Sequence, residues 1–213
     1  MFIGHFAPSL AAKTVAPRVP LWQLLLAGQA VDVMWAIFVW FGVERASVDL
    51  SLPSNPLTLG YMPYTHTLLG TVGWALLFGW LAARFAPQDQ RKATFGAIAL
   101  LVTGHWFLDL IVHRPDLAIA PGMKEHGLAL WDNATAAFWT EGALVAACGA
   151  WLVVRSAPAQ RLRRAALCGL LLALHAATLV IPPPPWLVAI TLSMLATFAV
   201  VMGAGLWSER PAS

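Results

Sequence analysis

The chain has 213 residues, of which 59% are hydrophobic and only 11% are charged. A soluble globular domain carries about 25% charged residues, so this composition argues against one and indicates an integral membrane protein. The formal net charge of +3 is small, which makes nucleic-acid binding a poor interpretation. Cys148 and Cys168 lie in apolar segments and form no CxxC motif. They therefore indicate neither a disulfide framework nor a thiolate metal site.

Six stretches meet the requirement of roughly 20 apolar residues for a membrane-crossing helix. They cover residues 21–43, 64–85, 93–113, 133–154, 164–181 and 186–207. Residues 1–20 are too short to cross and predict a helix that lies at the interface or dips partway into the bilayer. The predicted fold is an all-α, polytopic membrane bundle that forms a single domain. In it, residues 21–154 hold a site-bearing core of four helices and residues 164–207 a supporting pair.

The lysines and arginines are divided unequally between the two ends of these spans. Ten fall at one end: Lys13, Arg18, Arg84, Arg91, Lys92, Arg155, Arg161, Arg163, Arg164 and Arg210. Only Arg45, Arg114 and Lys124 fall at the other. Because short cytoplasmic loops carry the excess of positive residues, both termini are expected in the cytoplasm. Loops 44–63 and 114–132 are then expected to face outward.

The run HWFLDLIVHRPD, at residues 105–116, is the strongest candidate for a functional site. His105, Asp109 and His113 are spaced by four residues, which places them on one face of a helix. Ionisable groups at membrane depth are costly and therefore mark function. Each four-residue step rises about 6 Å, so His105 and Asp109 can share one ion. The same rise predicts that His113 lies further out, at the rim.

Other predicted spans carry further ionisable groups, namely Asp32, His66, Glu141 and His175. A divalent cation would offset the charge of buried carboxylates and accept neutral histidines as ligands. Histidine and carboxylate ligands without thiolate favour zinc, iron or manganese. His175, which stands alone in its span, is expected to make an interhelical hydrogen bond instead.

Several motifs resemble those of bacterial membrane-bound metal-dependent hydrolases, and their order is similar to that of the LexA-regulated inner-membrane hydrolases. The motifs are FIGHFAPSLAAK, the Asp32 segment, PYTHTLLG, GHWFLDLIVHRPDL and GLALWDN, within roughly the first 145 residues. The resemblance implies five metal ligands, which are His5, Asp32, His66, His105 and Asp109. That family shows a Pro-Asp-x-Asp segment, whereas Val33 and Met34 follow Asp32 here. The number of ions, one or two, therefore stays open.

The His-x-x-x-Asp element also resembles that of zinc phospholipase C and single-strand nucleases. Together these resemblances imply a bacterial inner-membrane metal-dependent hydrolase, with zinc as the first candidate metal. Because the site would be reached sideways from the bilayer or from outside, the expected substrate is an ester or phosphoester of a lipid-like molecule. Glu141 or His113 is expected to act as general base or acid. Arg114 and Asp116 are expected to contact the substrate at the rim. The alternatives are a metal or proton transporter, a non-catalytic scaffold stabilised by metal, and an iron-dependent redox enzyme.

Overall fold

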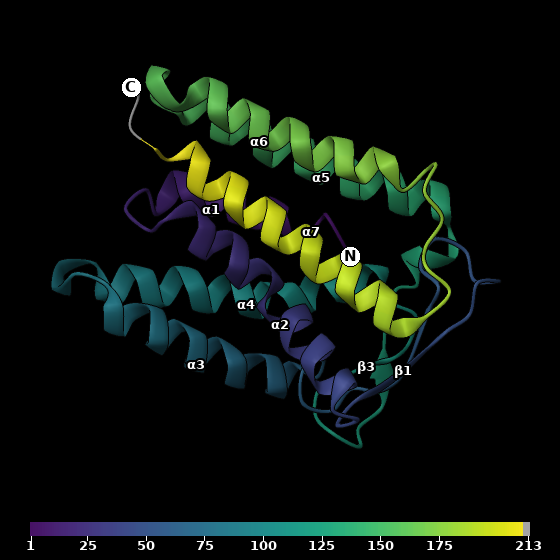
Figure 1. Cartoon of the computed structure of the whole chain (residues 1–213). Coiled ribbons are helices and arrows are strands. Elements are labelled where there is room, and N and C mark those ends of the chain that lie inside the picture. The colour runs from purple at the N-terminus through teal and green to yellow at the C-terminus, as the bar shows by residue number, and fades with distance from the viewer. Residues whose placement is uncertain (211–213) are drawn as a thin grey trace.

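Long apolar helices form the body of the molecule, as the computed structural model of residues 1–210 shows (Figure 1). The seven α-helices of these residues are α1 (Phe6–Val15), α2 (Leu21–Trp40), α3 (Leu68–Phe85), α4 (Arg91–Val112), α5 (Ala134–Arg155), α6 (Pro158–Ala177) and α7 (Leu187–Ser208). Five of them, α2, α3, α4, α5 and α7, are long and apolar enough to cross a membrane. The prediction of an all-α bundle with membrane-spanning helices is therefore confirmed by the length and composition of these helices.

The fifth predicted span, residues 164–181, differs from the helix found there. Helix α6 begins at Pro158 and ends at Ala177, where the chain enters a turn before the four prolines. Its first two turns contain Arg161, Arg163 and Arg164, so its apolar part is shorter than a span requires. Helix α6 packs against α5 and α7, but its composition does not make it a sixth span.

Helix α1 lies inside the bundle, where it packs between α2 and α5. Phe6, Ala7 and Leu10 are completely buried, and the Ser9 hydroxyl donates a hydrogen bond of 2.7 Å to the Leu24 carbonyl. Figure 1 places the first residue partway along the bundle rather than at its end. Of the two alternatives for residues 1–20, the packing matches a segment that enters the bundle.

Gly28 allows α1 to approach α2 closely. A Cβ atom at this position would lie 2.7 Å from the His5 carbonyl oxygen and 2.7 Å from Ser9 Oγ. We therefore expect Gly28→Ala to push the two helices apart and to lower the free energy of unfolding by about 1–3 kcal/mol. Thermal unfolding in detergent measures this effect. Gly96→Ala in α4 is the control, because its Cβ would meet nothing within 4 Å, and equal losses in both variants would contradict the explanation.

Two small hairpins and two 3-10 turns complete the structure. Strands β1 (Arg45–Val48) and β2 (Leu57–Tyr61) form an antiparallel pair, as do β3 (Leu117–Ala118) and β4 (Glu125–His126). The 3-10 turns are η1 (Gln88–Gln90) and η2 (Leu130–Asp132). Both hairpins lie at the same end of the bundle (Figure 1). The loops predicted to share one side of the membrane are thus neighbours in space.

The basic residues gather at the opposite end. Buried Lys13 forms an ion pair with Glu209, just after α7, and Arg18 pairs with Asp89 at 3.0 Å. The indole of Trp151 donates a hydrogen bond to Thr14, which ties the end of α5 to the same region. The separation into a basic end and a hairpin end agrees with the pattern in the sequence. The compartment that each end faces stays a prediction.

Candidate metal centre

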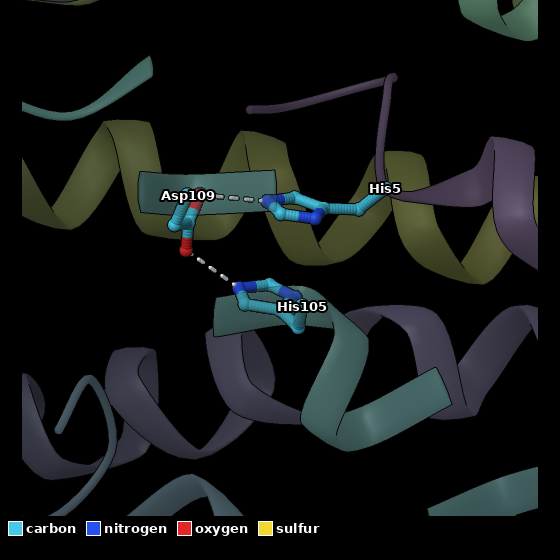
Figure 2. Close-up of side chains that lie close together, drawn as sticks. All are labelled: His5, His105 and Asp109. Carbon is cyan, nitrogen blue, oxygen red and sulfur yellow. Dashed lines mark hydrogen bonds and ion pairs between the residues drawn. The ribbon is translucent and has the colours of Figure 1, made fainter. Parts of the chain in front are cut away.

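Asp109 lies at the centre of a buried cluster of histidines. Helix α4 presents Asp109 and His105 on adjacent turns, and Asp109 Oδ2 is 3.0 Å from His105 Nε2. Its other oxygen, Oδ1, is 2.9 Å from Nε2 of His5, at the N-terminal end of α1. Figure 2 shows Asp109 bridging the two rings, which stack with centroids 3.7 Å apart. All three side chains are at most 2% exposed.

Asp32 and His66 complete the cluster from two other elements. Asp32 Oδ1, on α2, is 3.5 Å from Nε2 of both His66 and His105. His66 precedes α3, and its Nε2 is 3.7 Å from Asp109 Oδ2. The described residues therefore contain two groups that can hold a metal ion, His5 with His105 and Asp109, and Asp32 with His66 and His105. All five residues predicted as ligands come together, and His105 belongs to both groups.

The ring orientation of His105 suits a metal ligand. Its Nδ1 lies 2.8 Å from the Gly28 carbonyl oxygen, which can only accept a hydrogen bond, so Nδ1 carries the proton. In the neutral ring, Nε2 then directs its lone pair toward Asp109 and Asp32. Histidines that bind metals almost always donate their second ring N–H to an acceptor of this kind.

His66 is oriented by a longer chain of hydrogen bonds. The Thr65 hydroxyl donates to the Glu44 carboxylate, and His66 Nδ1 lies 2.8 Å from the same hydroxyl oxygen. Because that proton is committed to Glu44, the hydroxyl accepts from Nδ1–H, and His66 Nε2 is left free to bind. Glu44 is 1% exposed and also accepts the backbone N–H groups of Tyr64 and Thr65. Glu44 was not among the predicted site residues, because it stands 22 residues before His66 in the sequence.

We expect Thr65→Val to weaken metal binding about 10–100-fold, the usual effect of losing an outer hydrogen-bond partner of a ligand. Valine keeps the shape of threonine but cannot orient His66, whereas Thr65→Ser retains the hydroxyl and should restore binding. Titration of zinc against a chelating dye measures the affinity. Thr58→Val, on the exposed part of β2, is the matched control. Equal affinity in Thr65→Val and wild type would show that the chain from Glu44 does not matter.

Several buried polar atoms in the cluster have no hydrogen-bond partner among the described residues. They are His105 Nε2, Asp109 Oδ2 and His5 Nδ1. The first two face each other at 3.0 Å, and in the neutral tautomer of His105 both are acceptors. Two acceptors this close repel each other unless a cation lies between them. That cation is either a metal ion or a second proton on His105. Unpaired buried groups of this kind are rare in proteins, so the donor set fits a divalent ion.

His5 is held in the form that a metal requires. Burial, which is the largest cause, and the nearby Met1 amino group lower the pKa of His5 to about 3. The ring is therefore neutral at physiological pH and keeps a lone pair for coordination. The Met1 amino group itself donates a 2.7 Å hydrogen bond to Asp109 Oδ1.

Glu141, predicted as general base or acid, holds the segment that carries His5. Its Oε2 accepts the backbone N–H groups of Phe2 and Gly4, each at 3.1 Å. Glu141 thus links α5 to the first residues and positions His5 in the cluster. A direct catalytic role for Glu141 stays a prediction.

His113 lies deeper than the sequence predicted. It is 3% exposed, and its Nε2 is 3.3 Å from Asp109 Oδ1. The prediction rested on the rise of about 12 Å between His105 and His113, but Asp109 lies between them, one helical step of about 6 Å from each. The His113 N–H still donates to the Asp109 carbonyl at 2.8 Å, as in a helix, and the chain turns away from the helix only after His113. Asp116 accepts from His113 Nδ1 at 2.8 Å and orients the ring.

Arg114 and Asp116, predicted as substrate contacts, both have partners within the protein. Arg114 Nε donates to Asp132 at 2.7 Å, and its terminal nitrogens donate to the carbonyls of Pro53 and Asn55. These bonds tie the two hairpin loops together. Asp116 is bonded to His113. Their roles in substrate binding stay predictions that these contacts do not favour.

His175 makes the interhelical bond that the sequence predicted. Its Nε2 is 2.9 Å from the Phe138 carbonyl oxygen of α5, and its ring stacks on the Phe138 ring with centroids 4.3 Å apart.

A cavity of about 560 Å³ adjoins the cluster. One part of its wall is formed by Asp32, His66, Asp109 and His113. Most of the remaining wall is apolar and comes from α5, the end of α6, prolines 182–184 and α7, including Leu174, Leu179, Ile181, Ile190 and Met194. The last two helices were expected only to support the core, but they line this cavity. They approach the cluster through tertiary packing that their sequences do not reveal.

Comparison of the chain with protein-family models, with curated proteins and with solved structures finds no match. The likeness to membrane-bound hydrolases therefore rests on the quoted motifs alone. Fold and site define the class of the molecule, a helical bundle with five candidate membrane spans and a buried His/Asp cluster that can hold a metal ion.

Proposed function

We propose that the protein is a metal-dependent hydrolase of the bacterial inner membrane that cleaves an ester or phosphoester bond in a lipid-like substrate. The observation that carries the proposal is a pair of buried atoms without a hydrogen-bond partner, His105 Nε2 and Asp109 Oδ2, of which Asp109 belongs to the wall of an apolar cavity. Zinc is the first candidate metal, with iron and manganese as the others. One or two ions would be held by His5, Asp32, His66, His105 and Asp109.

The residues around the cavity would have different roles in the reaction. When bound, a divalent ion polarises a carbonyl or phosphoryl oxygen and lowers the pKa of water toward ~7. His113 lines the cavity and is oriented by Asp116, so it is placed to exchange a proton with a bound reactant. The apolar wall suits the tail of a lipid and limits the entry of water.

Element analysis of the purified protein and an assay of hydrolysis test the proposal together. The substrates are long-chain p-nitrophenyl esters and a p-nitrophenyl phosphodiester, and the variants are His105→Ala and His126→Ala. We expect His105→Ala to lose metal and turnover, whereas His126→Ala keeps both, because His126 lies in the β3–β4 hairpin, apart from the cluster and the cavity wall. Wild-type protein without metal, or with metal but inactive on the whole panel, contradicts the proposal.

The other candidate functions have less support from the contacts. A proton or metal path through Asp32, His105, Glu141 and His175 would need groups free to exchange ions. Glu141 and His175 are instead bonded to backbone groups. An optical spectrum of the purified protein separates an iron redox centre from a zinc site. Metal-dependent stability without hydrolysis would favour a scaffold.

A further inference from the structure

The indole of Trp35 is a buried donor without a partner, next to the proposed metal site. Trp35 lies on α2, three residues after Asp32, and is 3% exposed. Its ring lines the cavity and meets the His66 ring edge-on, with centroids 6.3 Å apart. Among residues 1–210, no atom accepts a hydrogen bond from Trp35 Nε1.

Several other tryptophans of the chain have a protein acceptor for the indole N–H. The indole of Trp40, also on α2, donates to Thr191 Oγ1 at 2.8 Å, and that of Trp106 donates to the His66 carbonyl at 3.1 Å. The indoles of Trp74 and Trp151 also have protein acceptors. Burying an unpaired donor costs about 1–3 kcal/mol, and buried tryptophans usually avoid that cost by bonding their N–H. Trp35 Nε1 is the indole nitrogen among residues 1–210 that is fully shielded from solvent and still has no partner. It therefore needs an acceptor that comes from outside the chain.

We propose that the Trp35 indole N–H donates a hydrogen bond to an oxygen of the substrate head group, the carbonyl or phosphoryl oxygen of the bond to be cleaved. This inference rests on the proposed function and adds a substrate-binding residue to it. An indole N–H can only donate, so it selects an acceptor atom. The neighbouring carboxylates, Asp32 and Asp109, would repel a head group rich in oxygen unless a metal ion compensates their charge. Trp35 adds attraction for that oxygen without adding charge.

The rest of the cavity wall indicates the chemical class of the ligand. Beyond Trp35 and the cluster, the wall is built mainly from apolar side chains, including Leu57, Leu59, Leu174 and Met194. A ligand that fits both the polar end of the cavity and its apolar wall has an oxygen-bearing head and an apolar tail. Dodecyl phosphate has both features and serves as a simple probe.

The test uses zinc-loaded, full-length protein labelled with ¹⁵N at the tryptophan indoles and titrated with dodecyl phosphate. The Trp35 N–H signal, assigned by its loss in Trp35→Phe, should move downfield, whereas the Trp40 signal stays in place. Trp35→Phe should weaken binding of the probe about tenfold, the expected value of one hydrogen bond to a charged acceptor. Trp40→Phe, the control on the same helix, should bind like wild type. Element analysis should show the same zinc content in all three proteins.

An unmoved Trp35 signal in the wild type overturns the inference, and so does a Trp35→Phe variant that binds the probe as tightly as wild type. The signal in the wild type decides the question even where the variant does not fold. Wild-type protein that holds no zinc overturns the proposed function and this inference with it, because Asp32 and Asp109 would then repel the phosphate. An unmoved Trp35 signal in zinc-loaded protein overturns this inference alone.

Discussion

Asp109→Ala is expected to release the metal and to abolish hydrolysis. Its carboxylate contacts His5 and His105 directly and lies 3.3 Å from His113, so its loss removes contacts to three histidines at once. Loss of an outer-shell partner alone weakens metal binding about 10–100-fold, and loss of this central ligand should exceed that. Element analysis and the ester assay measure the two effects. Asp109→Asn, which keeps the size but removes the charge, should also lose metal.

The matched control for this prediction is Asp49→Ala, in the β1–β2 hairpin, where the carboxylate accepts hydrogen bonds from the exposed residue Ser51. It should retain metal and activity. A double variant, His105→Ala with Asp109→Ala, that still binds metal at full stoichiometry would contradict the assignment of the site.

Removal of the metal with a chelator is expected to lower the melting temperature strongly. The proposed ligands come from α1, α2, α4 and the residue before the Thr67 cap of α3, so one centre joins four parts of the bundle. An ion at a free concentration 1,000 times its Kd stabilises the folded state by about 4 kcal/mol. For a protein of this size, that corresponds to a shift on the order of 10 °C. Thermal unfolding in detergent, with EDTA or with added zinc, measures it.

The same chelation should leave Asp109→Ala unchanged, because that variant has no ion to lose. Equal melting temperatures of the wild type with EDTA and with zinc would mean that no metal supports the fold.

The spans and the ligand candidates were readable from the sequence because both depend on local chemistry. Stretches of about 20 apolar residues predict membrane helices from their own composition, and five such helices are present. Charged groups are rare inside such stretches, so His105, Asp109 and Asp32 were conspicuous. The spacing of His105 and Asp109 also predicted correctly that they lie together on one helix face.

Local rules failed where the regular element ended. The helical rise from His105 placed His113 at the rim, but its ring contacts Asp109, one step back along α4, and the chain that follows α4 buries it. The arginines at the start of α6 shortened its apolar stretch, so the fifth predicted span is a helix that does not qualify as one. Both differences arise at helix ends, where capping and packing decide the chain's path.

The sequence by itself determined the class of the protein, a helical membrane bundle, and the kinds of ligand that it offers. Only the tertiary structure decided which of these groups meet. The burial of α1 brings His5 to Asp109 across 104 residues, and the Glu44 carboxylate reaches His66 through Thr65. The unpaired N–H of Trp35 was likewise invisible, because a missing partner is defined by every neighbour in space. Such contacts depend on how helices pack against one another, which the apolar pattern of each helix leaves undetermined.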